Sequence, residues 1–453
     1  MEDSLFVLLG TLLGFVSGII PGVGNTIMIL GSYPLLKDAS LLQMLLYYIA
    51  IISSSQFSGS VVATVFGVPG ESSSLPAVIE GNRMFHRGVG NFAISNAALG
   101  SVLGAFVAVV AVYSVLPFAI ELIQRFYNNN VQMVILILAT TSICVLMGKS
   151  IVQNIFVFAI GILLGLVGTN YVPNYVFLPQ IIPYETFPLL LTDLPLFPII
   201  VSCYVFPVLL QTNKMFTGFN NTRKYVDNNR FVEHIKTFVS NIFSSLRGSV
   251  FGCFIGLVPH IGTGVASNLS YAIERRFGIK HKQYKNNGDI KTLVAAETAN
   301  NSTGLVSLLP LILIGIPISA SEAMLLGYID INNYDINYET TVESGMFNTL
   351  VLWFIFINIA SFSLAWPLVR YVNILHKINM KHMLCATGIF LVALTIYLGF
   401  KNYEALYHFS VLVLLLPLGY WLRKAEPMIL MIAFILQDKL FASMHMFYTI
   451  HYG

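Results

Sequence analysis

Apolar segments of about 18 or more residues recur along nearly the whole chain. A helix of that length crosses a hydrocarbon layer of ~30 Å and pairs its backbone groups internally. Only 10% of the 453 residues are charged, whereas roughly 25% is usual in soluble domains, so a water-soluble core is excluded. The sequence therefore predicts an all-α polytopic membrane protein, embedded in a lipid bilayer.

Two of the apolar segments, about 5–36 and 241–273, are interrupted near the middle by proline and glycine. We predict that each forms a re-entrant hairpin, because freed backbone groups at membrane depth must be buried in protein. An ordinary pair of crossings with a tight turn is the alternative. About ten uninterrupted spans are predicted at 41–68, 92–117, 131–147, 151–168, 187–211, 292–329, 346–370, 383–399, 405–422 and 427–448.

Basic residues are distributed unevenly over the loops of this topology. One face collects 20 of the 24 Lys and Arg residues, and by the positive-inside rule that face is cytoplasmic. The loops at both ends of the second interrupted segment, 212–240 and 274–291, are strongly basic. A segment whose two ends lie on the same side is predicted to be a hairpin.

The two interrupted segments share a pattern of small residues. Glycines at every fourth position followed by a Pro-x-x-Gly break recur 238 residues later, as Gly10, Gly14, Gly18, Pro21 and Gly24 and then Gly248, Gly252, Gly256, Pro259 and Gly262. A second element follows each of them, because Gly67–Ser73 is similar to Gly315–Ser321 at a spacing of 248. Glycines spaced in this way let helices approach closely.

In the predicted topology the two hairpins open to opposite sides, so the repeats have inverted orientation. Inverted repeats with broken helices are typical of secondary transporters, whose substrate binds near the midplane. We predict a first inverted repeat at 1–118, scaffold spans with a basic loop at 119–240, a second inverted repeat at 241–372 and C-terminal scaffold spans at 373–453.

The motifs resemble the large membrane subunit of the tripartite tricarboxylate transporters, the TctA family. The similarity spans residues 5 to about 330 and rests on Gly18–Gly24, Gly59–Ser60, Val68–Gly70, Glu80–Met84, Arg87–Gly88, Gly248–Gly256, Ser267–Arg275, Ala296–Asn301 and Gly315–Pro317. The chain departs from the family pattern at Pro259-His260 and at Pro317-Ile318, where Pro-Gly is usual.

The resemblance implies a permease for citrate-like or other small organic anions in the inner membrane of a prokaryote. It implies a periplasmic solute-binding protein and a small membrane subunit as partners, and coupling to Na⁺ or H⁺. No phosphate-binding Gly-x-x-x-x-Gly-Lys-[Ser/Thr] loop is present in the sequence. No cofactor, metal or nucleic-acid partner is expected, and by analogy with other inverted-repeat carriers the scaffold is expected to form a homo-oligomer.

A carboxylate inside a membrane can be bound by helix N-termini, which supply backbone N–H groups and a partial positive charge. Short hydroxyl and amide side chains beside such breaks can bind substrate oxygens or a coupling ion. The candidate substrate-binding residues are Gly22, Gly24, Asn25, Thr26, Ser53, Ser54, Ser55, Gly70, Ser72, His260, Gly262, Thr263, Gly264, Asn300, Asn301, Ser302, Thr303 and Ser319. The candidates for ion or proton coupling are the carboxylates Glu71, Glu297 and Glu322.

Other interpretations remain open at this point. Any single Ser or Thr can instead bond to its own helix, Glu71 and Glu322 can lie at the membrane interface, and His260 can simply fill the hairpin tip. An intramembrane enzyme acting on lipid or peptide would use Glu297, His260 and Glu71, but the sequence has no His-Glu-x-x-His motif and such an enzyme leaves the repeat unexplained. An anion channel is less favoured because no filter-like signature is found. A non-enzymatic transporter is therefore predicted.

Overall fold

The structure is a computed structural model. It describes residues 2–20, 24–67, 69, 71–146, 150–167, 194–215, 231–258, 262–278, 288–375, 380–401 and 405–452. Within these ranges the chain is helical and contains no strand, as predicted. It forms two compact units, each built from two separate stretches of sequence: unit 1 is Met1–Ile120 with Gly218–Met383, and unit 2 is Glu121–Thr217 with Leu384–Gly453.

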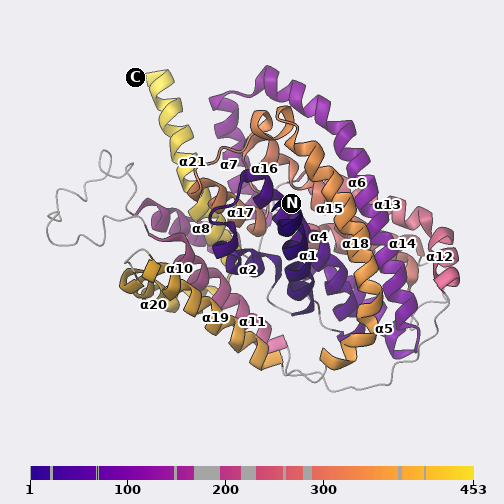
Figure 1. The fold of residues 1–453 in the computed structure, drawn as a ribbon. Coiled ribbons are helices and arrows are strands. Elements are labelled where there is room, and N and C mark those ends of the chain that lie inside the picture. Colours follow the sequence, from indigo (N-terminus) through magenta and orange to yellow (C-terminus); the bar gives the residue numbers. More distant parts are fainter. Residues whose placement is uncertain are drawn as a thin grey trace. The chain divides into compact units, whose positions relative to one another are not determined.

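The first half of unit 1 contains the first interrupted segment. Its elements are α1 (Glu2–Ile19), α2 (Gly24–Gly31), α3 (Tyr33–Leu36), α4 (Leu41–Phe66), the 3-10 turn η1 (Ser72–Ser74), the π-helical η2 (Ala77–Gly81), α5 (Asn82–His86) and α6 (Gly90–Phe126). The α1 helix packs along α4 (Figure 1).

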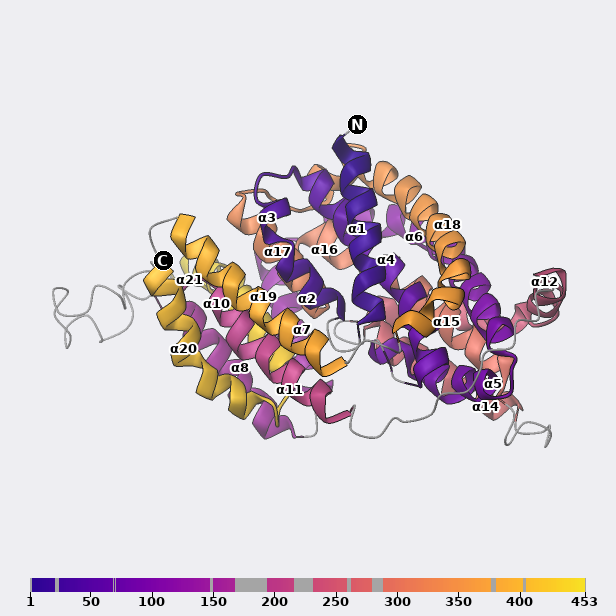
Figure 2. The ribbon, with the colours of Figure 1, turned by 60° about the horizontal axis from the view of Figure 1, so that its bottom comes forward.

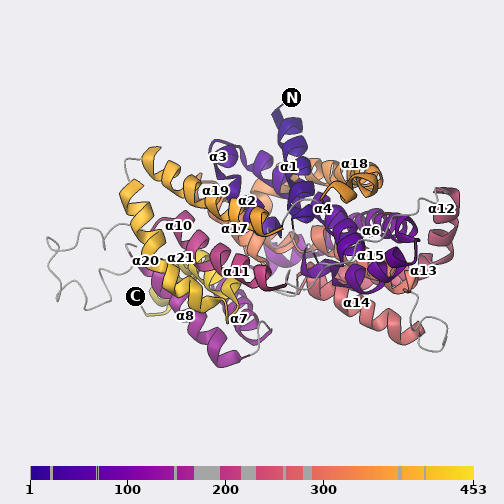
Figure 3. The ribbon, with the colours of Figure 1, turned by 90° about the horizontal axis from the view of Figure 1, so that it is seen from below.

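The second half of unit 1 contains the second interrupted segment. It comprises α12 (Phe231–Ser240), α13 (Ile242–Gly256), α14 (Thr263–Gly278), α15 (Ile290–Val306), α16 (Leu309–Ile314), α17 (Ala320–Ile331), the π-helical η7 (Glu339–Glu343) and α18 (Met346–Leu375). The α13, α14 and α15 helices pack together (Figure 3). The prediction of one uninterrupted span at 292–329 is wrong, because the segment is divided into α15, α16 and α17. Pro310 at the start of α16 lacks the N–H that would continue α15.

Unit 2 contains α7 (Asn129–Leu146), α8 (Ile151–Leu166), α10 (Leu196–Ile200), the π-helical η4 (Val201–Val205), α11 (Phe206–Met215), most of α19 (Met380–Lys401), α20 (Ala405–Leu422) and α21 (Pro427–Tyr452). The α21 helix packs against α7 and α8, and α20 packs against α10 and α11 (Figure 2). Close packing depends on glycine, since a Cβ at Gly161 would lie 2.5 Å from the Leu430 carbonyl oxygen.

The glycine patterns of α1 and α13 pack in the same register. Gly14 lies against Ile51 and Ser54 of α4, and Gly252 lies against Ala299 and Ser302 of α15. The second pair of partners follows the first by 248 residues, the spacing found between the two copies of the second repeated element. A Cβ at either glycine would lie 2.5 Å from a carbonyl oxygen of the partner helix. The sequence repeat is therefore also a repeat of helix packing.

The breaks after α4 and α16 also match. Gly67 and Gly315 end these helices with φ of 66° and 67°, in the left-handed region that glycine adopts without a Cβ penalty. Their N–H groups donate to the carbonyls of Ala63 and Leu311. Four residues beyond each glycine the chain is extended again, with φ and ψ of −136° and 164° at Glu71 and −135° and 163° at Ser319.

The second interrupted segment folds back on itself. Arg247 near the start of α13 donates to both carboxylate oxygens of Glu274 near the end of α14, at 3.0 and 2.7 Å, and Ser244 donates to the same carboxylate. The α13 and α14 helices have 15 and 16 residues, so each is about 22–24 Å long. Both are shorter than a ~30 Å hydrocarbon layer, and their outer ends lie together.

Among the described residues, three helices are long and apolar enough to cross a membrane: Leu41–Phe66, Gly90–Phe126 and Met346–Ala365. The pair Val232–Ser240 and Ile242–Gly256, bent by 65°, would be a fourth if it formed one span, and six further apolar helices are shorter. The number of spans stays a prediction. The most apolar part of Leu41–Phe66 is 94% buried inside the protein, so α4 is a central helix.

Candidate functional site

The site is built where the two equivalent helices α4 and α15 meet. Ser60 of α4 donates a 2.7 Å hydrogen bond to Oε2 of Glu297 on α15. One turn away along α4, Gln56 lies beside Gly304, where a Cβ would be 3.3 Å from the glutamine amide nitrogen. Positions 56 and 304 are equivalent at the 248-residue spacing, so the repeats meet at matching positions. The helices run antiparallel there, because the contact moves forward along α4 as it moves backward along α15.

One face of α15 carries the polar side chains of this crossing. Glu297, Asn300, Asn301 and Gly304 follow the i, i+3, i+4, i+7 spacing of a single helix face. The two ends of this face, Glu297 and Gly304, both contact α4, so the face as a whole points toward α4. All three polar residues are buried, although the alanines beside them would suit a packed helix better.

Several polar atoms at the crossing are buried without a hydrogen-bond partner among the described residues. They are Nε2 of Gln56, Oε1 of Glu297, Oδ1 and Nδ2 of Asn300, and Oδ1 of Asn301. Leaving a buried polar group unsatisfied costs about 1–3 kcal/mol. A group of such atoms in one place is therefore typical of a site that receives a ligand.

Glu71 brings the first break to the same region. Its carboxyl group lies within hydrogen-bonding reach of Ser55 on α4 and of Asn25 near the start of α2. Asn25 in turn accepts a 3.3 Å hydrogen bond from Ser17 of α1. Glu71 is also close enough to Glu297 for their charges to interact. The break, the hairpin and the two crossing helices thus converge.

At the second break, the carboxylate of Glu322 has a different role from that of Glu71. Glu322 accepts hydrogen bonds from the N–H groups of Ile318 and Ser319 and from the Ser307 hydroxyl, at 2.7, 3.2 and 3.1 Å. It therefore caps the start of α17. In the first repeat the hydroxyl of Ser74 occupies the equivalent position and accepts from the Glu71 N–H. Capping by Ser74 leaves the Glu71 side chain available for other partners.

Three of the predicted hydroxyls lie in helix packing. Ser54 donates to the Ala50 carbonyl at 2.6 Å, Ser302 donates to the Ser249 carbonyl at 3.1 Å, and Thr303 donates to the Gly252 carbonyl at 2.9 Å. Ser53 is buried. The Ser302 and Thr303 bonds join α15 to α13, and the Ser54 bond turns back on its own helix, as the alternative interpretation of single hydroxyls expects.

The hairpin tips are described in part. Gly24 has φ of 55°, and both Gly24 and Gly262 have open space where a Cβ would stand. Thr26, Thr263, Gly264 and Ser319 are partly buried at the first turns of α2, α14 and α17. The predicted site residues Gly22, Gly70 and His260 lie outside the described residues, as does the side chain of Ser72.

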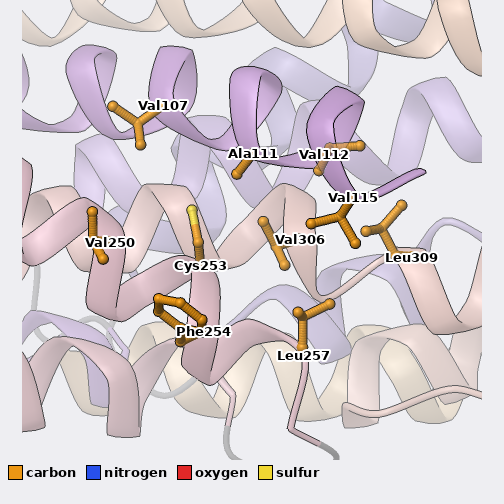
Figure 4. A pocket seen from close by; sticks show the side chains of 10 residues that line it. All are labelled: Val107, Ala111, Val112, Val115, Val250, Cys253, Phe254, Leu257, Val306 and Leu309. Carbon is orange, nitrogen blue, oxygen red and sulfur yellow. The ribbon is translucent and has the colours of Figure 1, made fainter. Parts of the chain in front are cut away.

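A pocket of ≈190 Å³ lies elsewhere in unit 1, between α6, α13 and the α15–α16 segment (Figure 4). Its lining is apolar and includes Val112, Cys253, Phe254 and Val306. The residue equivalent to Cys253 in α1 is Phe15, which packs into an apolar cluster in the first repeat. The side chain of Cys253 is smaller than that of Phe15, so the pocket reflects a packing difference between the repeats. The pocket does not contain the polar site.

Sequence reasoning missed two residues of the crossing, Gln56 and Ser60. Gln56 is the one amide of α4 beyond its first turn, where Gln43 lies, and Ser60 follows Gln56 by four residues on the same face. That spacing was a usable signal.

Comparison with known proteins identifies the family of the chain. The family model for the tripartite tricarboxylate transporter TctA family matches residues 5–433. A curated protein of Agrobacterium vitis, described as an uncharacterized 52.8 kDa protein in the TAR-I ttuC' 3' region, is 27% identical over 330 residues. That match covers 70% of this chain and 62% of the relative. No solved structure matches the chain. With its apolar helices and a match over nearly its whole length, the chain is an integral membrane protein that belongs to the tripartite tricarboxylate transporter TctA family.

Proposed function

We propose that the protein is the permease of a secondary transporter that moves small organic anions, of the di- or tricarboxylate class, across the cytoplasmic membrane of a prokaryote. One observation carries the proposal: buried amides without partners gather where two equivalent helices of a repeat cross. A duplicated pair of broken helices around a central polar site is the arrangement that alternating access requires.

The inverted orientation of the two repeats is supported by the antiparallel crossing of α4 and α15. Two equivalent helices that meet antiparallel at equivalent positions, Gln56 and Gly304, are related by a local two-fold axis. If that axis lies in the membrane plane, the α1–α2 hairpin opens to one side and the α13–α14 hairpin to the other. Each hairpin then controls one access path.

The substrate's carboxylates would be bound by neutral donors. Nε2 of Gln56 and Nδ2 of Asn300 are buried donors without partners among the described residues. The first turns of α2 and α14, at Gly24–Thr26 and Gly262–Gly264, add backbone N–H groups with partial positive charge. Hydrogen bonds from such groups to a charged carboxylate contribute about 1.5–3 kcal/mol each.

The two compact units match the parts that alternating access needs. Both hairpins and both breaks belong to unit 1, as do α18 and most of α6, and unit 2 contains α7, α8, α10, α11, α20, α21 and most of α19. We propose that unit 1 carries the site while unit 2 serves as the scaffold and the surface for homo-oligomer formation. A periplasmic solute-binding protein and a small membrane subunit would complete the system, as the family's name, tripartite, implies. A Na⁺ or H⁺ gradient would supply the energy.

Uptake of labelled citrate and related di- and tricarboxylates tests this function directly. Cells that express the chain together with a periplasmic solute-binding protein and a small membrane subunit of the same system are expected to accumulate at least one of these anions. An ionophore that collapses the cation gradient should abolish the accumulation. Normal accumulation after collapse of every cation gradient, or uptake of none of the anions by a correctly inserted complex, would contradict the proposal.

A further inference from the structure

A hydrogen-bond network joins the second hairpin to the first repeat. Its centre is the carboxylate of Glu80 in η2, a residue that is only 3% exposed. Oε1 of Glu80 accepts a 2.7 Å bond from the Tyr271 hydroxyl on α14, and Oε2 accepts a 3.0 Å bond from the N–H of Asp289 before α15. Arg275, one turn further along α14, donates to the Tyr271 hydroxyl at 2.8 Å, and Arg83 lies 3.7 Å from Oε1 of Glu80. One buried carboxylate therefore joins three separate segments of the chain.

A second bond extends this contact to the first break. Ser267 of α14, one turn before Tyr271, donates to the Ser73 carbonyl of η1 at 2.7 Å. Both serines are buried, at 0% and 1% exposure, so solvent does not reach them. Movement of α14 away from the first repeat would break this bond and the bond to Glu80 together.

The first hairpin makes the equivalent contact with different chemistry. Tyr33, which follows α2, is equivalent to Tyr271 at the spacing of 238 residues. Tyr328 of α17 is equivalent to Glu80 at the spacing of 248 residues. The two tyrosine rings lie 5.2 Å apart, and the Tyr328 hydroxyl donates to the Leu30 carbonyl of α2 at 3.0 Å. Each hairpin is thus bound by the other repeat at matching positions, once through a carboxylate and once through a neutral aromatic pair.

The two contacts differ in strength and in sidedness. Loss of a hydrogen bond to a charged group changes an equilibrium constant by about 10- to 150-fold, and loss of a bond between neutral groups by about 2- to 10-fold. The carboxylate contact is therefore the stronger one. It carries Arg83 and Arg275, and in the predicted topology both residues belong to the basic, cytoplasmic face.

We propose that Glu80 and Tyr271 form a latch that closes the cytoplasmic access path by binding α14 to the first repeat. The aromatic contact of Tyr33 with Tyr328 closes the opposite path less tightly. Before substrate binds, the transporter therefore favours access from the periplasm, the side on which a solute-binding protein would deliver the anion. Arg275 is a positioning residue, because it holds the Tyr271 hydroxyl beside the carboxylate. The inference rests on the proposed function for the sidedness of the two paths.

The experiment measures access to the α14–η1 interface from the cytoplasmic side. Ser73→Cys is introduced in a chain whose four native cysteines have been replaced. The Ser73 hydroxyl is buried without a hydrogen-bond partner among the described residues, and the carbonyl that accepts from Ser267 is kept. Inside-out membrane vesicles without substrate are treated with a membrane-impermeant maleimide. Tyr271→Phe removes the latch hydroxyl alone and should raise the labelling rate by about 10-fold or more.

Tyr328→Phe is the matched control, because it removes a hydroxyl from the aromatic contact at the equivalent position. Its labelling rate in inside-out vesicles should stay at or below that of the parent. Glu80→Gln keeps one acceptor oxygen but loses the charge, so its rate should lie between those of the parent and Tyr271→Phe. Unfolding is detected separately with Ser245→Cys, which is 0% exposed in α13 and should stay unlabelled in every variant.

Two results would overturn the latch. The first is equal labelling of Ser73→Cys with and without Tyr271→Phe in inside-out vesicles. The second is a rise with Tyr328→Phe as large as the rise with Tyr271→Phe, because the two contacts would then not control separate paths. The assay contains no substrate, so failure of anion uptake would contradict the proposed function without changing these readings.

Discussion

Replacing Gly252 with leucine is expected to destabilise the folded protein and lower its yield. Its Cβ would lie 2.5 Å from the Ala299 carbonyl oxygen and overlap the Ser302 hydroxyl, and backbone of α15 cannot move aside as a flexible side chain can. Overpacking of this kind costs about 1–3 kcal/mol or more, which lowers the folded-to-unfolded ratio roughly 5–30-fold or further. Gly14→Leu should have the same effect, because Gly14 lies as close to Ile51 and Ser54 of α4 as Gly252 lies to the equivalent residues of α15.

Folded yield after detergent extraction, measured as the monodisperse fraction in fluorescence-detected size exclusion, gives the result. Gly262→Leu is the matched control, since a Cβ there meets open space and the residue lies on the same hairpin. It should keep the yield of the wild type. Equal yields for Gly252→Leu and Gly262→Leu would show that the close glycine contact is not what holds α13 against α15.

The second large effect is expected from Asn300→Leu, which should reduce uptake by about 10- to 150-fold while raising the stability of the protein. The uptake falls because one donor to the substrate's carboxylate is lost, worth about 1.5–3 kcal/mol. The stability rises because both polar atoms of Asn300 are buried without partners among the described residues. A leucine has a similar size and carries no polar atom, so the substitution removes that cost.

The two readouts are initial uptake rate and melting temperature of the purified protein. Asn358→Leu on α18 is the control, since Asn358 is also buried and its Oδ1 also lacks a partner among the described residues. It should leave uptake near the wild-type rate. If Asn300→Leu lowers stability and uptake together, Asn300 is a packing residue and the crossing is not the binding site.

Much of the fold could be predicted because the spacing of glycines and the length of apolar segments determine helices and their close contacts from nearby residues alone. The Gly10–Gly14–Gly18 pattern predicts a close helix contact, and the repeat spacing predicts that Gly248–Gly252–Gly256 makes the same one. Charge distribution predicted a hairpin with two ends on one side, and the Arg247–Glu274 pair joins those ends. The division of 292–329 was missed, because its hydropathy continues through Pro310 and only the backbone reveals the change of direction.

The site was harder to predict, because it depends on which face of each helix meets which partner. Asn300 and Asn301 were identified as polar residues at membrane depth, but so were Ser302 and Thr303, which the structure places in the α13 contact. Asn301 and Ser302 are adjacent in α15, but successive residues of a helix point in different directions, so one lies at the crossing and the other in the α13 contact. Glu71 and Glu322 both follow a proline break in the sequence, yet Ser74 caps the first break and Glu322 caps the second. Only the three-dimensional contacts separate these cases.

The central claim is that unit 1 contains two repeats of opposite orientation in the membrane. It is tested most directly by the sidedness of two exposed positions, Asp38 after α3 and Arg276 near the end of α14. Single cysteines are introduced at each position in a chain whose four native cysteines have been replaced, and intact cells are treated with a membrane-impermeant maleimide before and after permeabilisation. The account predicts that Asp38→Cys is labelled in intact cells and that Arg276→Cys is labelled only after permeabilisation. Labelling of both positions from the same side would contradict it.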